Sequence, residues 1–436
     1  MTSPLSQSQL GVYYACLTTV NDRTNYQNAF LFTLSQTVNL DRLREAVYGA
    51  MCAHPYLMGR IVLNSDGAPE HESGTCPALE DCVTMQEVKS IDEVRATFSR
   101  TMDIYGERLY RCEIYKTPQQ NYLYLDIHHL LLDGFTLILL FREIERLYAG
   151  EKAVGEQMDG AAIAQAEEIL RADKEKMETA RKWYANTFCD AADTDSLPIK
   201  ETVLDSPTSS LCYKYFSLSV SKEDVHAVVQ RFGAKESTVW QAAFGLLLAT
   251  YGAEDKASWC TAWMGRTDQR MMTTATMMVH TLPVWMQMNA DMPVARLLSE
   301  LREQMKQTQN YGYYAYQDAV RDLGLNNRVM FAYQGTILVD NCALRLAGEM
   351  IPYEDLRLPT PGWNLCVELL DGKDGYSLKM AYDNAEYSDA FIRELAECYS
   401  TIVRSMTTAE HVRDLECCSA TQKEWLNRLN PEKPLS

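Results

Sequence analysis

The chain has 436 residues, of which 47% are hydrophobic and 23% charged, and its formal net charge is −18. This length exceeds what one ordinary core serves and predicts two domains or lobes. The hydrophobic content is typical of a folded globular protein and argues against extensive disorder. Phosphate binding needs clustered cations, so the acidic balance argues against a nucleic-acid partner.

The local sequence argues against a membrane-spanning helix and against a secretory signal. A membrane-spanning helix needs roughly 18 apolar residues. The longest apolar stretch, 239–251, is shorter and includes Gln241. The start, MTSPLSQSQL, lacks the basic and apolar regions of a secretory signal, which predicts a cytoplasmic protein.

The thirteen cysteines form no CxxC pair, and an odd number cannot all be bridged internally. We therefore expect reduced thiols that serve as small core residues. The adjacent Cys417 and Cys418 are interpreted as packing residues, because metal-ligand spacing is missing around them. No metal site is predicted.

Helical and strand periodicities alternate along the first half of the chain. The predicted elements are helices over 41–54, 90–102 and 135–148, and strands over 109–115 and 122–127 joined by a turn at 117–121. A polar segment over 150–198 contains a predicted helix at 174–187 and ends in the acidic loop CDAADTDSLP. This segment is the best candidate for a boundary between two lobes.

The second half begins again with the same kinds of element. The predicted elements are a strand over 211–220, a helix capped by Ser221 with Asp224 in its first turn, an apolar helix capped by Ser237 and running to 251, a strand over 257–264, and a hairpin of strands 367–370 and 376–382. Two successive α/β lobes of similar size fit this pattern.

The most informative segment is His128-His129-Leu-Leu-Leu-Asp133-Gly134, which lies between a predicted strand and a predicted helix. Neighbouring side chains of a strand point to opposite faces, so the two histidines cannot both reach one cleft. One is expected to be buried or structural and the other free to meet a substrate. That geometry argues against a shared metal, which needs converging ligands.

Acyl transfer suits this arrangement of residues. The free histidine could accept a proton from an attacking amine or alcohol, while nearby backbone N–H groups stabilise the oxyanion. Gly134 stands where a missing side chain would permit a tight turn or the close approach of a ligand. A lone histidine or an Asp-Gly pair is usually structural, but the combination HHxxxDG between a strand and a helix favours an active site.

HHxxxDG resembles the signature of nonribosomal peptide synthetase condensation domains, which are related to chloramphenicol acetyltransferase. The resemblance extends along nearly the whole chain. The further matching segments are the Ser-x-x-Gln opening within 4–13, His54-Pro55-Tyr56-Leu57, Gly265-Arg266, Val279-His280-Thr281-Leu282-Pro283, Tyr316-Gln317-Asp318, Val329-Met330-Phe331 and a linker-like stretch over 421–429.

The resemblance implies an α/β fold of two acetyltransferase-like lobes that form a V-shaped pseudo-dimer with the active site at their interface. The expected division is an N-terminal lobe over 1–175 that carries HHxxxDG, a C-terminal lobe over 176–425, and the start of a linker to an adenylation domain over 426–436. The isolated domain is expected to be a monomer.

The resemblance also implies the roles of the site residues. His129 would meet the amino group of the acceptor, with His128 and Gly134 completing the motif. Asp133 would be structural and paired with Arg266 from the second lobe. A largely buried Asp needs such a cation, and loss of the partner would cost about 3–5 kcal/mol.

Three residues, Thr136, His280 and Trp363, are expected in the substrate tunnel. His280 stands where the family often has Asn, which leaves substrate scope open there. The aromatic-rich motif expected near 160–170 is replaced by Ala161-Ala-Ile-Ala-Gln-Ala, and Ala53 replaces an Arg before His54.

The expected reaction joins a thioester-bound donor acyl or aminoacyl group to the α-amino group of a carrier-bound acceptor. The domain itself would bind no cofactor, because both substrates are carried on phosphopantetheine of donor and acceptor peptidyl carrier proteins, or the donor on coenzyme A. Two alternatives stay open: a stand-alone CoA-dependent acyltransferase, and a non-catalytic domain that recruits carrier proteins. The methionine just before the opening motif leads us to expect a chain-initiating role or a donor on a separate protein.

Overall fold

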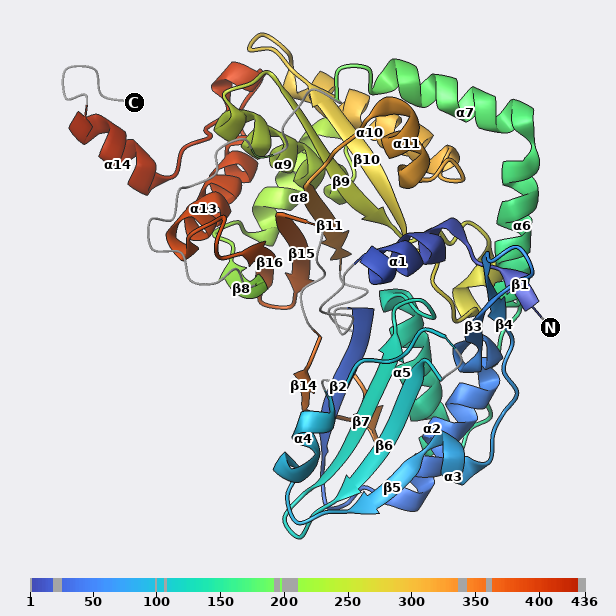
Figure 1. Cartoon of the computed structure of the whole chain (residues 1–436). Coiled ribbons are helices and arrows are strands. Elements are labelled where there is room, and N and C mark those ends of the chain that lie inside the picture. The colour runs from blue at the N-terminus through green and yellow to red at the C-terminus, as the bar shows by residue number, and fades with distance from the viewer. Residues whose placement is uncertain are drawn as a thin grey trace. The chain divides into compact units, whose positions relative to one another are not determined.

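The computed structural model describes residues 2–18, 26–98, 100–105, 108–191, 197, 211–335, 343–357 and 363–429 (Figure 1). The chain divides into two compact units. Unit 1 comprises Met1–Met177, Met264–His280 and Asp340–Thr360, and unit 2 comprises Glu178–Trp263, Thr281–Val339 and Pro361–Ser436. Both units mix helices and sheets, as the predicted α/β class requires. Within the described residues, every helix is too short or too polar to cross a membrane.

The main sheet of unit 1 has the strand order β14-β2-β7-β6-β5. Only the β5–β6 pair is parallel. A smaller sheet has the order β1-β4-β3. The strands are β1 Thr2–Pro4, β2 Gln27–Leu34, β3 Arg60–Leu63, β4 Pro69–Glu72, β5 Thr84–Glu87, β6 Tyr110–Lys116, β7 Asn121–His128 and β14 Tyr353–Asp355, with a separate hairpin of β12 Arg345–Leu346 and β13 Glu349–Met350.

One face of this sheet packs against helices (Figure 1). The other face carries a small cluster of buried residues that includes Phe98, Tyr115 and Tyr124. Alternate residues of β7, such as Leu125 and Ile127, join the core with α5, while Tyr124 belongs to the opposite face. The helices are α1 Gln7–Thr18, α2 Leu40–Ala53, α3 Leu79–Cys82, α4 Asp92–Phe98, α5 Gly134–Tyr148 and α6 Gly160–Ala172, with a 3-10 turn at Pro55–Met58. The next helix, α7 Lys174–Thr187, begins in unit 1 and lies mostly in unit 2. The strand period of two therefore sets which side of β7 each motif residue occupies.

Unit 2 is built on a sheet of order β10-β9-β11-β15-β16-β8, in which β11 runs parallel to both neighbours. Its strands are β8 Leu211–Ser217, β9 Lys256–Trp263, β10 His280–Gln287, β11 Val329–Gln334, β15 Leu365–Gly372 and β16 Gly375–Asp383. Its helices are α8 Lys222–Phe232, α9 Glu236–Gly252, α10 Val294–Asn310, α11 Tyr316–Leu323, α13 Asp389–Ser405 and α14 Ala420–Leu429, with a 3-10 turn at Val412–Asp414. The 3-10 turn at Gln269–Thr273 belongs to unit 1. The apolar α9 lies in the core of this unit, which explains its nearly uninterrupted hydrophobic sequence.

Two late segments join unit 1 rather than a contiguous second lobe over 176–425. Met264–His280 is tied there by Arg266, which reaches Asp133, and Asp340–Thr360 by β14, which pairs with β2. Such long-range pairing leaves no local sequence signal, so a single boundary after 175 could not capture it. Of the expected linker over 426–436, residues 430–436 lie outside the described part, and α14 ends at Leu429.

Most predicted elements are present, with four corrections. The predicted 90–102 helix is α4 only, because carbonyl groups near its end accept hydrogen bonds from Arg111 instead of continuing the helix. Ser237 does not cap α9: the helix begins at Glu236 after Lys235, and no side chain caps it. The helix α6 was not predicted. Most of the predicted acidic loop before 198 lies outside the described residues.

The fourth correction concerns the cysteines, which we expected to be reduced. Cys52 at the end of α2 is paired with Cys76, with 5.6 Å between their Cα atoms. The tertiary fold brings together thiols that are 24 residues apart in the chain. Ten other cysteines of the described residues form no disulfide, and most of them are buried or partly buried, as expected of small core residues.

Candidate active site

The HHxxxDG motif occupies the connection from β7 to α5. β7 ends at His128, and α5 begins at Gly134 with Asp133 as its N-cap, whose carboxylate accepts the Thr136 N–H at 2.8 Å. The capping preference of Asp and the end of the strand ladder explain the local conformation. Gly134 is the first residue of α5 and does not have a positive φ. The expected tight turn at this glycine is therefore not present. The role of Gly134 in ligand approach stays a prediction.

His128 is buried, with only 1% of its surface exposed. Its Nδ1 accepts the Leu130 N–H at 3.1 Å, and its Nε2 lies 3.9 Å from Cys16 Sγ. Burial, with a smaller contribution from the neighbouring His129, lowers the pKa of His128 to about 3. The ring is therefore neutral at physiological pH and acts as a structural acceptor within the loop.

His129 is partly exposed and its backbone is held firmly. Its N–H donates to the Tyr26 carbonyl at 2.7 Å, and the next N–H, of Leu130, donates to His128. Nδ1 of His129 is buried and makes no hydrogen bond to the described residues. Nδ1 of His129 is thus shielded from solvent, although the side chain as a whole is partly exposed.

Electrostatics keep the His129 imidazole neutral. Burial lowers its pKa, and the charge of Arg357 acts in the same direction, while nearby backbone groups and the Asp133 carboxylate oppose the shift. Arg357 follows β14, and its guanidinium carbon lies 5.0 Å from the ring centroid of Phe30. Phe30 belongs to β2, the strand that pairs with β7. A neutral imidazole can accept a proton, which is what a general base requires.

Asp133 is the centre of a fully buried polar cluster. Nη2 of Arg266 lies 3.2 Å from Oδ1 of Asp133, and both side chains have no exposed surface. The Met278 N–H donates to the other carboxylate oxygen at 3.0 Å. Arg266 and Met278 belong to the Met264–His280 segment of unit 1, and Asp133 to its first segment. The Asp133–Arg266 pair therefore lies within unit 1 and not across two lobes as expected.

Arg266 makes further contacts that explain why an arginine is needed. Its Nη1 donates to the carbonyls of Met271 and Thr274 at 2.6 and 2.8 Å, and Nη2 reaches Thr136 Oγ1 at 3.2 Å. Thr136 in turn donates to the Thr276 carbonyl at 2.9 Å. The planar guanidinium serves four acceptor groups at once from its fixed fork of five N–H donors, whereas an ammonium has only three. Thr136 is fully buried in this cluster.

Gly265 and His280 are packed against each other. Gly265 has a φ of 70°, and a Cβ there would collide with the Met278 carbonyl oxygen and approach Cδ2 of His280 to 2.8 Å. Glycine is therefore required before Arg266. Burial lowers the pKa of His280 to about 4, so its ring is neutral. Trp363 lies just before β15 in unit 2, and the tunnel assignments of Thr136, His280 and Trp363 stay predictions.

Several residues around the motif loop were not singled out from the sequence. The amide of Gln9 donates to the Leu130 carbonyl at 2.8 Å, and the Tyr56 hydroxyl donates to Gln9 Oε1 at 3.1 Å. His54 Nδ1 lies 3.0 Å from Glu156 Oε1, which also accepts the Ala275 N–H. The Ser-x-x-Gln and His-Pro-Tyr-Leu segments contain these residues, but their targets are distant in sequence.

A second polar cluster lies on the opposite face of β7. The Asp126 carboxylate has no exposed surface and accepts hydrogen bonds at Oδ2 from Arg111 at 2.5 Å, Gln27 at 2.7 Å and Tyr124 at 3.0 Å. Its Oδ1 is buried without a hydrogen bond to the described residues. Burial raises the pKa of Asp126, and Arg111 opposes this shift.

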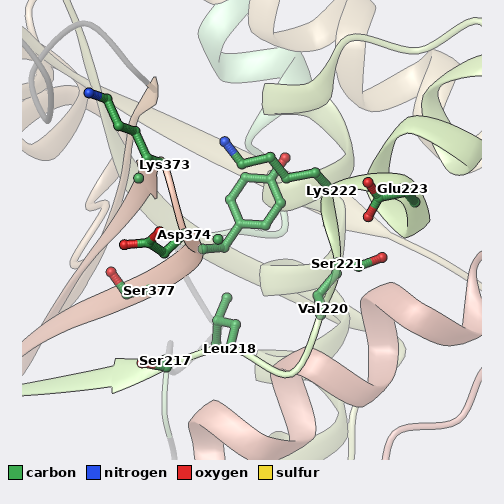
Figure 2. A pocket seen from close by; sticks show the side chains of 12 residues that line it. Ser217, Leu218, Val220, Ser221, Lys222, Glu223, Lys373, Asp374 and Ser377 are labelled. Carbon is green, nitrogen blue, oxygen red and sulfur yellow. The ribbon is translucent and has the colours of Figure 1, made fainter.

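A hollow of about 550 Å³ lies in unit 2, between the start of α8 and the turn joining β15 to β16. Figure 2 shows side chains that line it. Lys222 extends over the Tyr376 ring, with Nζ 5.8 Å from its centroid and 2.8 Å from Asp371 Oδ1. The lining is polar and of mixed charge, and none of the sequence-predicted site residues belongs to it. We assign it no role in acyl transfer.

Comparisons with known proteins identify the family. The Condensation domain family model matches residues 1–426. Tyrocidine synthase 2 of Brevibacillus parabrevis is 20% identical over 415 residues, which cover 92% of this chain and 12% of that protein. A dimodular nonribosomal peptide synthase of Bacillus subtilis (strain 168) is 22% identical over 410 residues, which cover 89% of this chain and 17% of that protein. The chain thus spans a small part of these relatives.

The fold is also that of known domains. The first condensation domain of the calcium-dependent antibiotic synthetase, solved with a substrate analogue, has a TM-score of 0.75 and 15% identity, and the alignment covers 95% of this chain and 98% of that one. This likeness confirms the predicted fold class. Because the family model spans almost the whole sequence, the resemblance seen in HHxxxDG is confirmed: the chain belongs to the condensation domain family found in nonribosomal peptide synthetases.

Proposed function

We propose that this chain forms an amide bond between a donor acyl or aminoacyl thioester and the α-amino group of an acceptor amino acid. Both substrates would be carried on phosphopantetheine of carrier proteins, or the donor on coenzyme A. The observation that supports this most is His129, a partly exposed and neutral imidazole whose backbone is fixed at the end of β7. The family membership supplies the reaction class.

In the proposed reaction, the amine nitrogen attacks the thioester carbonyl. The N–C bond forms, the C–S bond breaks, and the thiolate of the pantetheine arm leaves. His129 accepts the proton that the amine loses and returns it to the departing sulfur. A base in this position typically contributes about 10²–10⁴-fold, while alignment of two tethered substrates corresponds to effective molarities of about 10⁵–10⁸ M. Alignment is thus the larger effect.

His129→Ala tests the proposal. Single-turnover assays would offer aminoacyl-loaded carrier protein as acceptor, and either acyl-loaded carrier protein or acyl-coenzyme A as donor, with the amide product measured by mass spectrometry. The variant should form amide about 10²–10⁴-fold more slowly, with an unchanged melting temperature. His226→Ala, at an exposed position of α8, is the matched control and should behave as the parent does.

The outcomes separate the alternatives. Full activity of His129→Ala beside an active parent would refute the role of this residue. Carrier binding without transfer from any donor would favour the recruitment domain. Transfer from acyl-coenzyme A to a free amine or alcohol, without need of a carrier, would favour the stand-alone acyltransferase. A requirement for acyl-coenzyme A together with a carrier-bound acceptor would favour chain initiation over elongation.

A further inference from the structure

The start of α1 is joined directly to the motif loop. Ser6 and Gln9 form a reciprocal capping pair, in which the Gln9 N–H donates to Ser6 Oγ at 3.3 Å and the Ser6 N–H donates to Gln9 Oε1 at 3.0 Å. This Ser-x-x-Gln arrangement is a capping box. Because Oε1 is engaged in the cap, the rotamer of Gln9 is fixed and its amide NH₂ is aimed away from the helix. That NH₂ donates to the Leu130 carbonyl at 2.8 Å.

Tyr56 holds the same glutamine from another direction. Its hydroxyl donates to Gln9 Oε1 at 3.1 Å, and burial raises its pKa to about 12, so the hydroxyl remains a donor. The Tyr56 ring is stacked on His71, with ring centroids 3.7 Å apart. Gly160 leaves room for the ring, since a Cβ there would lie 2.8 Å from Tyr56 Cδ2. Tyr56 is thus fixed by packing and in turn fixes Gln9.

The contact with Leu130 completes the restraint of the backbone around His129. The His129 N–H is bound by Tyr26, and the Leu130 N–H by His128. The Leu130 carbonyl is the next polar group along the chain, and Gln9 binds it. Three consecutive peptide groups that bracket the His129 side chain are therefore each held by a separate partner.

We propose that Gln9, supported by Tyr56, is a positioning residue that sets the orientation of the His129 imidazole through the Leu130 carbonyl. This inference rests on the proposed function for its catalytic consequence, but the orientation itself is a property of the free protein. Gln9 is only 1% exposed, and the contact joins groups 121 residues apart. A misplacement of about 1 Å at a reacting centre can cost about 10²-fold in rate, so a fixed loop matters for alignment.

Gln9→Glu separates the cap from the loop contact. A glutamate retains an oxygen that accepts the Ser6 N–H and the Tyr56 hydroxyl, but it has no N–H for the Leu130 carbonyl. The expected result is a kcat about 10- to 100-fold lower with KM nearly unchanged. Gln241→Glu is the matched control, because Gln241 is 2% exposed and hydrogen-bonded to Thr261 and Trp259 in unit 2. It should lose stability without this loss of kcat.

A second readout needs no substrate. Carbethoxylation of His129 by diethyl pyrocarbonate, mapped by peptide mass spectrometry at several pH values, reports the accessibility and the pKa of its imidazole. Gln9→Glu should change both the rate and the pH midpoint of this modification, whereas Ser6→Ala, which weakens only the cap, should leave them as in the parent. Tyr56→Phe, which keeps the ring, should cause a smaller change in the same direction and serves if Gln9→Glu does not fold.

The two readouts distinguish the possible failures. If no variant and not even the parent forms amide, the proposed function fails, and the His129 modification profile still decides the positioning role. If Gln9→Glu and Tyr56→Phe both show the parental profile at His129, Gln9 only caps α1 and the positioning role is wrong. A shifted profile in Gln241→Glu as well would likewise overturn it, since the effect would then be one of general destabilisation.

Discussion

Two buried aspartate–arginine pairs, Asp126–Arg111 and Asp133–Arg266, lie on either side of the motif histidines in the sequence, and their surroundings differ. Asp126 lies on β7 and is paired with Arg111 of the adjacent strand, with all its hydrogen bonds on one carboxylate oxygen. Asp133 lies past the strand, and both its oxygens are engaged, by Arg266 and by the N–H groups of Thr136 and Met278. One pair lies on a sheet that the backbone ladder already defines, while the other joins segments that are held together by side-chain hydrogen bonds, among them that of Thr136 to the Thr276 carbonyl.

The comparison shows where buried charge is needed. Within a sheet the ladder hydrogen bonds determine the geometry, so a polar cluster on its face adds little that packing could not supply. The loop between β7 and α5 has no ladder, so its position relative to Met264–His280 depends on the buried hydrogen bonds of the Asp133–Arg266 pair and of Thr136. Loss of the Asp133–Arg266 pair is therefore expected to lower both the stability of the fold and the rate of amide formation. Loss of the Asp126–Arg111 pair is expected to lower mainly the stability.

The largest expected effect follows removal of Arg266. Arg266→Leu leaves the Asp133 carboxylate buried without its cation, which should lower the free energy of unfolding by about 3–5 kcal/mol and abolish amide formation. Urea denaturation measures the loss. The double variant Asp133→Ala/Arg266→Leu should cost less than the sum of the single variants. Additive losses would show that the two side chains are not energetically coupled.

A smaller effect is expected for Arg111. Arg111→Met removes one donor, but Gln27 and Tyr124 still bind Asp126, whose pKa is already raised by burial, so the acid can protonate. The expected loss is about 1–3 kcal/mol by urea denaturation. Asp126→Asn in the Arg111→Met background should recover part of it. A loss as large as that of Arg266→Leu would contradict the contrast between the two pairs.

The smallest effect at neutral pH is that of the His128 ring, because it is uncharged in both the folded and the unfolded chain there and its effect appears only in acid. The folded-state pKa of His128 is about 3, below its ordinary value of 6.5, so its contribution to stability is present above pH 6.5 and declines as pH falls toward about 3. Each pH unit in this window should lower the free energy of unfolding by about 1.4 kcal/mol. His128→Gln should flatten the dependence of unfolding free energy on pH, and His226→Gln, at an exposed site, should not. An unchanged slope in His128→Gln would mean that this ring does not carry the sensitivity.

Much of the local structure could be predicted from the sequence. The helix over 174–187 coincides with α7, the strand over 122–127 lies within β7, and Ser221 with Asp224 forms the predicted capping box of α8. These features depend on residues a few positions apart, where periodicity and capping act directly. The HHxxxDG segment was likewise predictable as a strand-to-helix connection, including the burial of one histidine and the partial exposure of the other.

The sequence by itself therefore determined the elements, the motif and, through resemblance, the family. Only the tertiary structure decided that Met264–His280 belongs with unit 1, that Cys52 meets Cys76, and that Gln9 reaches Leu130. The physical reason is one of range. Helices and strands are selected by interactions between near neighbours, whereas these contacts join residues tens to more than a hundred positions apart, and their partners exist only once the chain has folded.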